Sequence, residues 1–404
     1  MIKKIAIAVA AMLSLAPAMA GNVTIKVSNG LDIQRQELVE IDAQAVYSHL
    51  GVQSGTPFIV RNALGQEVSY QITHDGKLLI ETAVQPKGTA TFTVEQGNPQ
   101  KPVSFAFGKV YVDRLDDLTW ENDRGIYRMY GPALQRTGER SFGTDLWTKS
   151  MPYLDAENRY KAEFSVRPEM SRLRKAGKHD DARRLEATIS YHLDHGTGLD
   201  AYGVGPTLGC GAPALMSKGK LVLPYCYKTY EILDNGPLRF TVHLTYNPTD
   251  VDGDKNVVEH RLVSLDKGSN YNRITVWYDG VSHKIDLASG VVIHSADTKS
   301  IALGCDYALY ADPTDRPEQL NQQVYVGTVY PFGKVKTKYL PIDTKVNGVA
   351  GHAIGVTEYK PGERFTYCFG SAWSSYDVRT WTEWLVRSKS FIDTQRNPLK
   401  VEIK

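Results

Sequence analysis

The sequence predicts an all-β protein: a large antiparallel sandwich preceded by a small β-sandwich, with one short helical insertion. Three observations support this fold class. Short runs of alternating apolar and polar residues fill positions 22–97, and longer alternating runs follow them. Helical crossovers do not separate these runs, which argues against a parallel α/β sheet and favours two packed antiparallel sheets.

The first twenty residues have the form of a signal peptide. Lys3 and Lys4 precede an apolar run over residues 5–15, and a small-residue pattern ends at Ala20, directly before Gly21. We therefore expect residues 1–20 to be removed and the mature protein to be periplasmic or secreted. No later segment reaches the roughly 20 consecutive apolar residues of a membrane-spanning helix, so no membrane span is expected.

The small domain is predicted over residues 21–104. Alternation is clearest at residues 23–27 and 89–94, and turn signals occur at 29–30 and 75–76. A polar stretch at 96–102, with two prolines, has the composition of a linker. The boundary is therefore expected near residue 104, and residues 105–404 form the large domain.

Longer strands are predicted in the large domain. In residues 239–246 the apolar side chains of Phe240, Val242, Leu244 and Tyr246 share one face. Residues 272–278 alternate in the same way. The only segment with helical spacing of apolar residues is 168–185, which we interpret as an insertion between strands.

Charge and motifs exclude several classes of function. The formal net charge is +2, and without Lys3 and Lys4 it is zero, so the mature chain has no general attraction for nucleic acid. The phosphate-binding, nucleophile-elbow, HExxH and dinucleotide motifs are absent from the sequence. We expect no cofactor and no metal.

The four cysteines are compatible with disulfides in an oxidising compartment. They are Cys210, Cys226, Cys305 and Cys368, which allow three full pairings. A pair of Cys210 with Cys226 is favoured because the loop between them is short.

Residues 120–132 form the densest polar and aromatic segment. On a strand, Asn122, Arg124 and Arg128 would share one face, and two guanidinium groups there could clamp a uronic-acid carboxylate. Trp120 and Asn122 are candidate substrate-binding residues. The alternative is that Glu121 or Asp123 pairs with these arginines and fixes the strand in the fold.

A second segment, residues 191–205, combines titratable side chains with glycines. His195 or His192 could take a proton near neutral pH, Tyr191 could donate one, and Asp194 could bind substrate. Two alternatives remain open: a turn held by Asp and His hydrogen bonds, and a metal site built from His192, Asp194 and His195.

Three further substrate-binding candidates lie near the C-terminus. His352 and Glu358 form a titratable pair in residues 351–359, and Trp373 offers an aromatic face of the kind that packs against sugar rings. For the aromatic residue, packing in the core is the competing interpretation.

Several segments together resemble a known family. Residues 120–132, 191–211, 233–239 and 264–270 are similar to a secreted bacterial family catalogued as a domain of unknown function. The resemblance implies association with polysaccharide-degrading enzymes and dehydration of oligosaccharides that contain uronic acid. The large domain resembles the galactose-mutarotase-like supersandwich, a fold shared by sugar epimerases and several polysaccharide lyases.

We therefore expect a carbon–oxygen lyase, either an oligosaccharide dehydratase or a polysaccharide-lyase-like enzyme, whose partner is an acidic oligosaccharide. One alternative is a sugar mutarotase or epimerase that uses His352 or His195 with Glu358. Another is a non-catalytic protein that binds glycans through its aromatic surface.

Overall fold

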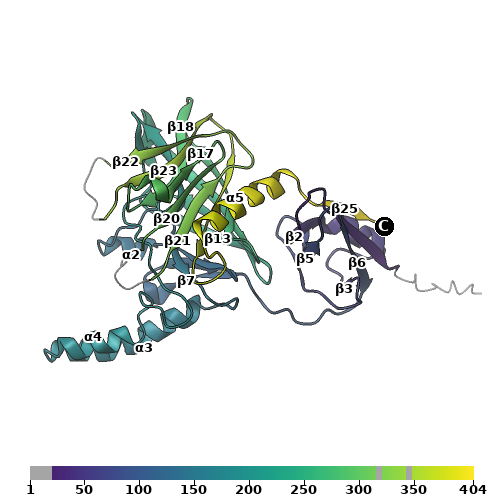
Figure 1. The fold of residues 1–404 in the computed structure, drawn as a ribbon, viewed down its shortest axis with the longest axis horizontal. Helices are drawn as coiled ribbons and strands as arrows, with labels where there is room; N and C mark the ends of the chain where they lie inside the picture. The colour runs from purple at the N-terminus through teal and green to yellow at the C-terminus, as the bar shows by residue number, and fades with distance from the viewer. Residues whose placement is uncertain (1–20, 315–320, 343–347) are drawn as a thin grey trace, which may run out of the picture.

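A computed structural model describes residues 21–314, 321–342 and 348–404. The expected signal segment, residues 1–20, lies outside the described residues. The fold is mostly β, as the sequence predicts. Figure 1 shows a small β domain beside a larger sandwich, with a helical hairpin that projects away from both.

The small domain is a sandwich of two antiparallel sheets. One sheet has the order β25-β1-β6-β3 and the other β2-β5-β4. On β1 the residues Val23, Ile25 and Val27 are buried while their neighbours face outwards, which is the alternation seen in the sequence. The bounds are β1 (Val23–Ser28), β2 (Arg35–Asp42), β3 (Phe58–Asn62), β4 (Tyr70–Ile72), β5 (Lys77–Val84), β6 (Thr89–Gln96), β25 (Lys400–Ile403) and helix α1 (Ala43–Leu50).

The last strand of the chain belongs to the first domain. β25 pairs with β1, with Ile403 opposite Ile25 and Val401 opposite Val27. The division expected near residue 104 did not include this strand, because strand pairing over such a separation leaves no local signal in the sequence.

The large sandwich consists of a nine-stranded and a five-stranded antiparallel sheet. Phe240, Val242, Leu244 and Tyr246 point into the core between the sheets, as predicted. The nine-stranded sheet contains β13 (Tyr227–Asn235), β14 (Arg239–Tyr246), β16 (Asp254–Asp266), β17 (Tyr271–Asp279), β24 (Phe365–Trp373), β21 (Val324–Val329), β20 (Tyr307–Asp312), β19 (Ile301–Leu303) and, paired with β16, β15 (Thr249–Val251). The other contains β12 (Lys220–Val222), β11 (Cys210–Ser217), β18 (Ile285–Ile293), β23 (Gly351–Tyr359) and β22 (Lys336–Pro341).

A smaller four-stranded sheet packs against one end of the sandwich. It has the order β10-β9-β8-β7, with β7 (Phe107–Tyr111), β8 (Asp117–Glu121), β9 (Gly125–Met129) and β10 (Asp145–Thr148). The ring of Trp120 lies 6.2 Å from that of Phe240, and Tyr127 makes an edge contact with Phe369. These contacts join the small sheet to the sandwich core. The short helices η1 (Val112–Arg114) and α2 (Pro132–Arg136) flank the strands.

The helical insertion is longer than the sequence predicts. Helix α3 (Ala156–Lys175) begins twelve residues before the expected start, and α4 (His179–Ala187) follows it. The expected single helix over 168–185 is broken because Gly177 has φ +72°, in the left-handed region. Among the described residues no helix is long and apolar enough to cross a bilayer.

Helix α5 (Trp381–Arg396) was not anticipated from the sequence. A capping box of Thr380 and Glu383 starts it. Its Trp384 packs on Tyr271 of β17, so the helix covers part of the outer face of the nine-stranded sheet (Figure 1).

All four cysteines are free thiols, so the favoured pair of Cys210 and Cys226 is not formed. Cys210 is fully buried against the carbonyl of Gly370 on β24. Cys226 lies instead beside Asn247, because the β11–β12 hairpin carries the chain away before it reaches this residue.

Candidate active site

A cluster of charged and aromatic side chains surrounds Arg128 on β9. We call it the Arg128 cluster, and its members are Arg114, Asp117, Arg128, Tyr130, Asp145, Tyr191, His192 and Asp200. Strand register sets its centre, because Asp145 on β10 lies directly opposite Arg128. Three sheet strands, the short helix η1 and the loop before β11 therefore contribute side chains to one place.

Arg128 is buried among three carboxylates. Its Nε donates to Asp145 Oδ2 at 2.8 Å, and its Nη2 contacts the same oxygen. Nη2 also lies 3.4 Å from Asp200 Oδ2, and Nη1 lies 3.7 Å from Asp117 Oδ2. A buried charge needs such partners, because an unpaired one costs several kcal/mol.

Aromatic rings enclose the same guanidinium group. Its carbon lies 4.8 Å from the ring centre of Tyr130 and 5.0 Å from that of Trp147. Tyr191 stacks on Trp147 with centroids 4.6 Å apart. The Arg128 Nη2 also donates to the hydroxyl of Tyr130 at 3.2 Å, which fixes the position of that phenol.

The loop that carries His192 is held by backbone contacts. Asp200 N donates to Tyr191 O at 2.7 Å, and Leu199 O accepts from Thr148 N at 2.8 Å. These bonds place His192 Nδ1 3.6 Å from Asp200 Oδ2. The His192 side chain is 44% exposed, so this histidine joins the buried cluster to solvent.

Burial controls the protonation of the cluster. Burial raises the pKa of Asp117 to about 6, although Arg128 and Arg114 oppose this rise. Burial also raises the pKa of Tyr191 and raises that of Tyr130 well above the usual value. Both phenols are therefore protonated at neutral pH and able to donate a hydrogen bond.

The accessible edge of the cluster has groups of three kinds. His192 can accept a proton, Tyr130 can donate one, and Arg114 provides a cation whose side chain is 12% exposed. The Nη2 of Arg114 pairs with Glu139 at 3.2 Å. The arrangement suits proton transfer beside an anionic group.

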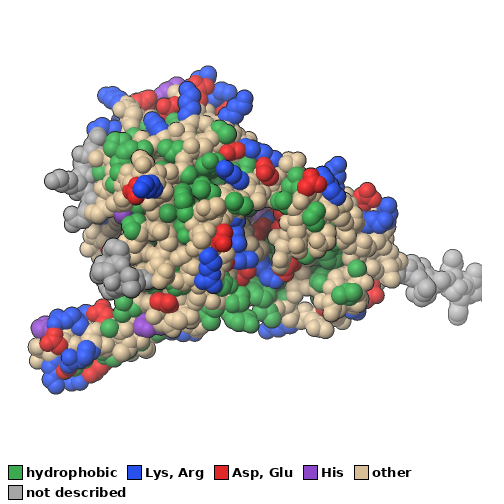
Figure 2. All heavy atoms as spheres, in the orientation of Figure 1, with side chains coloured by type: hydrophobic (Ala, Val, Ile, Leu, Met, Phe, Trp, Pro, Cys, Tyr) green, Lys and Arg blue, Asp and Glu red, His purple; other side chains and the backbone are tan. Residues whose placement is uncertain are grey.

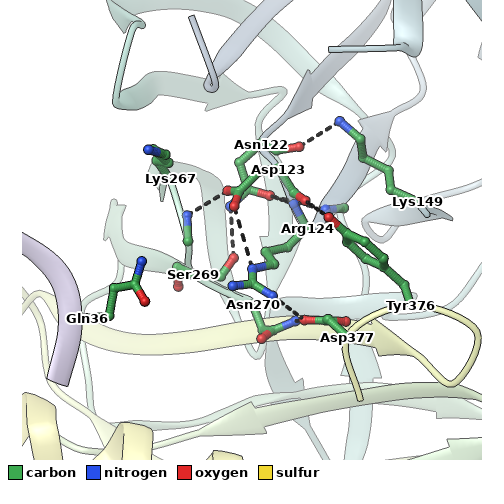
Figure 3. Close-up of polar contacts among 12 residues, drawn as sticks. Gln36, Asn122, Asp123, Arg124, Lys149, Lys267, Ser269, Asn270, Tyr376 and Asp377 are labelled. Carbon is green, nitrogen blue, oxygen red and sulfur yellow. Dashed lines mark hydrogen bonds and ion pairs between the residues drawn. The ribbon is translucent and has the colours of Figure 1, made fainter. Parts of the chain in front are cut away.

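The expected clamp of Arg124 with Arg128 is not formed. Arg124 precedes β9, in a turn where its backbone N–H donates to Asn122 Oδ1, so strand alternation does not extend to it. Its Nη1 pairs with Asp377 at 3.1 Å and its Nε lies 3.6 Å from Asp123 (Figure 3). Arg124 instead lines a cleft between the small domain and the sandwich.

Three of the expected substrate-binding residues are buried and bond within the fold, so they are not placed to bind a ligand. They are Trp120, Asn122 and Trp373. Trp120 is fully buried and donates to Asn272 Oδ1 at 2.8 Å. The Asn122 amide donates to the carbonyls of Asp266 and Ser269. Trp373 is 4% exposed and donates to Asn321 O at 2.9 Å.

Asp194 and His195 are placed in an exposed turn. Asp194 accepts hydrogen bonds from the backbone N–H groups of Gly196 at 2.8 Å and Gly198 at 3.0 Å, which is the turn held by Asp hydrogen bonds. His195 Nε2 contacts Ser190 O at 3.0 Å. His192, rather than His195, is the histidine that reaches Arg128 through Asp200.

His352 and Glu358 do not form one site. They lie six positions apart on β23, which corresponds to about 20 Å along a strand. His352 is buried and accepts from Leu208 N at 3.3 Å, and burial lowers its pKa to about 4. Glu358 is exposed and pairs with Lys284 at 2.9 Å.

Sequence reasoning missed several members of the cluster. Arg114, Asp117 and Asp145 carry no local motif, and Tyr130 and Asp200 lie in the two polar segments without having been singled out. The pairing of β8, β9 and β10 brings Asp117 and Asp145 to Arg128. Within the described ranges, no group of three or more His, Cys, Asp or Glu side chains is arranged to hold a metal ion. The trio of His192, Asp194 and His195 is thus not such a group.

Comparisons with known proteins show one matching family and distant similarity to a few individual proteins. A family model described as "Domain of unknown function (DUF4861)" matches residues 27–401. A protein of Formosa agariphila described as "Uncharacterized protein P7" is 26% identical over 287 residues, covering 67% of this chain and 66% of that protein. The chain therefore spans just under two thirds of that relative's length.

Two solved structures cover 95% of this chain at 8% identity. One is an alpha-mannosidase from Enterococcus faecalis V583, with a TM-score of 0.46, and the other is a protein in glycosyl hydrolase family 38 from Enterococcus faecalis, with a TM-score of 0.47. The chain spans 46% and 47% of their lengths.

Proposed function

We propose that this chain, which belongs to the DUF4861 family, eliminates water from a uronic-acid residue of an oligosaccharide, or cleaves the chain there by β-elimination. The observation that carries the proposal is the meeting of a histidine and a tyrosine at one buried guanidinium group. Asp200 links His192 to Arg128, and Arg128 positions the hydroxyl of Tyr130.

The proposed reaction begins with proton removal. The C–H bond next to the uronate carboxylate breaks, and His192 takes the proton. The Asp200 carboxylate, 3.6 Å from His192 Nδ1, is the ion-pair partner of the imidazolium that forms. Arg114 binds the substrate carboxylate, which gains negative charge at this stage.

The second half of the reaction expels the leaving oxygen. The electron pair from the broken C–H bond forms a carbon–carbon double bond, and the C–O bond at the next carbon breaks. Tyr130 protonates the departing oxygen, so the leaving group is water in a dehydration and a sugar hydroxyl in a chain cleavage. His192 then returns a proton to Tyr130 through solvent. The product is an unsaturated uronate.

Export to the periplasm or beyond is part of the proposal. It rests on the signal-peptide form of residues 1–20, with cleavage before Gly21. N-terminal sequencing of the protein recovered from the periplasm tests it, and a start at Met1 would contradict it.

The reaction is tested with oligosaccharides that contain uronic acid. Absorbance of the conjugated double bond and the product mass are followed together. Loss of one water indicates dehydration, and unsaturated fragments indicate cleavage. An unchanged mass for every acidic oligosaccharide tried would reject elimination and leave glycan binding or epimerisation.

His192→Gln and His195→Gln form a matched pair for this assay. His192→Gln should lower the rate about a hundred- to ten-thousand-fold, because a positioned base contributes that much. His195→Gln should keep the wild-type rate, because His195 lies in the exposed turn. The opposite result would move the base to His195.

A further inference from the structure

A second polar surface lies between the two domains. It is a cleft of about 670 Å³, which is within the usual size of ligand sites. We call it the interdomain cleft. β2 of the small domain forms one wall, and the β16–β17 turn with helix α5 forms the other. Figure 2 shows the hollow between the two bodies, with charged side chains at its edge.

Contacts on both sides of the cleft hold its walls at a fixed separation. On one side Gln71 of the small domain bonds to the backbone of Leu238 and Arg239, and His74 pairs with Asp234 at 2.8 Å. On the other side Arg35 donates to Thr394 O at 3.2 Å at the end of α5. A cleft fixed in this way is preformed, so a ligand does not have to order it.

Four arginines line the wall formed by the sandwich and α5. They are Arg124, Arg239, Arg273 and Arg387. Arg239 pairs with Asp266 and Glu40, at 2.5 and 2.7 Å, so the other three are the cations open to a ligand. Arg124 and Arg387 share one oxygen of Asp377, at 3.1 and 2.8 Å. Asp377 is only 6% exposed, whereas the two guanidinium side chains are 30% and 38% exposed. The carboxylate therefore lies behind the cations that face the cleft.

Arg273 adds a cation that is held by a neutral partner. Its Nη2 donates to Gln395 Oε1 at 2.7 Å, and its guanidinium carbon lies 5.0 Å from the ring centre of Phe332. Among the described residues, no carboxylate lies within salt-bridge distance of Arg273. The Arg273 side chain is exposed, so its remaining donors are available to a ligand.

Amide side chains accompany the arginines. Gln34 and Gln36 line the cleft from the small domain, and Gln395 and Asn270 line it from the other wall. Gln36 lies across the gap from Ser269 and Arg124 (Figure 3). Guanidinium groups match carboxylate and sulfate groups, and amides bond to sugar hydroxyls.

We infer that the interdomain cleft is a second, non-catalytic binding site for an acidic oligosaccharide that carries carboxylate or sulfate groups. It goes beyond the proposed reaction, because none of the arginines that line it belongs to the Arg128 cluster. Such a site would hold a long acidic chain on the enzyme while another part of it occupies the active site, and so raise the effective concentration of substrate.

Binding is measured by calorimetry in the His192→Gln background, where turnover does not consume the ligand. The probes are a galacturonic acid hexamer, a sulfated heparin-derived hexasaccharide and, as a neutral control, maltohexaose. The two acidic probes distinguish carboxylate from sulfate recognition. We expect acidic probes to bind more tightly than maltohexaose and to weaken as salt is raised.

The decisive variant is Arg273→Gln/Arg387→Gln. Each lost charge-assisted contact should raise Kd for the acidic probe about tenfold at this site. The matched control is Arg172→Gln/Arg184→Gln on the exposed helical hairpin, which removes the same charge and should leave Kd unchanged. Arg387→Lys keeps the charge and should recover part of the affinity.

Two results would overturn the inference: equal binding of acidic and neutral probes, or wild-type binding by the double arginine variant. Circular dichroism and thermal melting of both double variants establish that they are folded. Because the binding measurement involves no turnover, it tests the second binding site independently of the proposed reaction. The proposed reaction is rejected only if no unsaturated product forms.

Discussion

Burial of a single side chain, His352, changes its pKa strongly. His352 is 2% exposed, and burial lowers its pKa to about 4 from a usual value of about 6.5. Its Nδ1 has no hydrogen-bond partner among the described residues, so the folded structure offers nothing that would stabilise the imidazolium form. The histidine is therefore neutral in the folded protein at neutral pH.

This predicts a pH dependence of stability. Between about pH 6.5 and 4 the unfolded state binds a proton at residue 352 and the folded state does not, so stability falls as pH is lowered through this window. The slope contributed by one such group approaches about 1.4 kcal/mol per pH unit. Above pH 6.5 this contribution is complete.

The test is urea unfolding of wild type and His352→Gln at pH 7, 5.5 and 4.5, where the pH values are chosen to be about evenly spaced across the window. The glutamine amide oxygen can replace Nε2 as the acceptor for Leu208 N. The variant should lose less stability on acidification. Asp117, whose raised pKa acts in the opposite direction, cancels in the comparison. Parallel pH curves for the two proteins would refute the assignment.

At the scale of elements, one buried ion pair fixes the start of the helical hairpin. Glu121, at the end of β8, accepts from the backbone N–H groups of Asp155 and Ala156, where α3 begins. Its other partner is the fully buried Lys149, at 2.7 Å. The carboxylate thus compensates both the positive end of the helix and a buried ammonium group.

We predict that Glu121→Gln lowers the free energy of unfolding by about 3–5 kcal/mol, because it leaves the Lys149 ammonium group unpaired. Chemical denaturation measures this loss. Glu121→Gln/Lys149→Met should be less destabilised than the sum of the single variants, since the double change removes both charges. Additive losses would show that the pair is not coupled.

Local patterns explain why strands were predictable and helices less so. The two-residue period of β14 and β17 is visible in the sequence because one face of each strand is buried and the other is not. The hairpin α3–α4 is polar on most of its surface, so its first half gave no apolar stripe. α5 has a capping box, a signal that could have been read at Thr380 and Glu383.

The candidate site was predictable only in part, again for a physical reason. The sequence drew attention to Arg128, Tyr191 and His192 because each lies in a dense polar segment. Among their carboxylate partners, Asp200 lies in the same segment as His192. Asp117 and Asp145 come from β8 and β10, and strand register brings these two to Arg128. Arg124 was misplaced because one turn residue, Asn122, ends the alternation.

At the scale of the whole molecule, the first and the last strand of the described residues pair with each other. After α5 the chain crosses to the small domain, where β25 pairs with β1 and closes that side of its sheet. Leu399, Val401 and Ile403 pack on the small-domain core. Pro398 and Leu399 also line the interdomain cleft, so the same segment joins the domains and shapes the space between them.

We predict that a chain ending at Asn397 keeps its sandwich but has a less stable small domain. Three half-buried apolar side chains and the hydrogen bonds to β1 are lost, which amounts to about 3 kcal/mol if each side chain contributes roughly half of a fully buried one. The exposed edge of β1 would also be free to pair with another chain. Calorimetry should resolve a transition of the small domain at a lower temperature while the main transition stays in place. Size-exclusion chromatography should detect association through β1.

A second variant, Val401→Ser/Ile403→Ser, separates the loss of apolar contacts from the exposure of the β1 edge. It keeps the strand but removes its apolar contacts, so it should lower the temperature of the first transition without promoting association. A truncated chain that melts in one transition at the wild-type temperature would show that β25 does not stabilise the small domain.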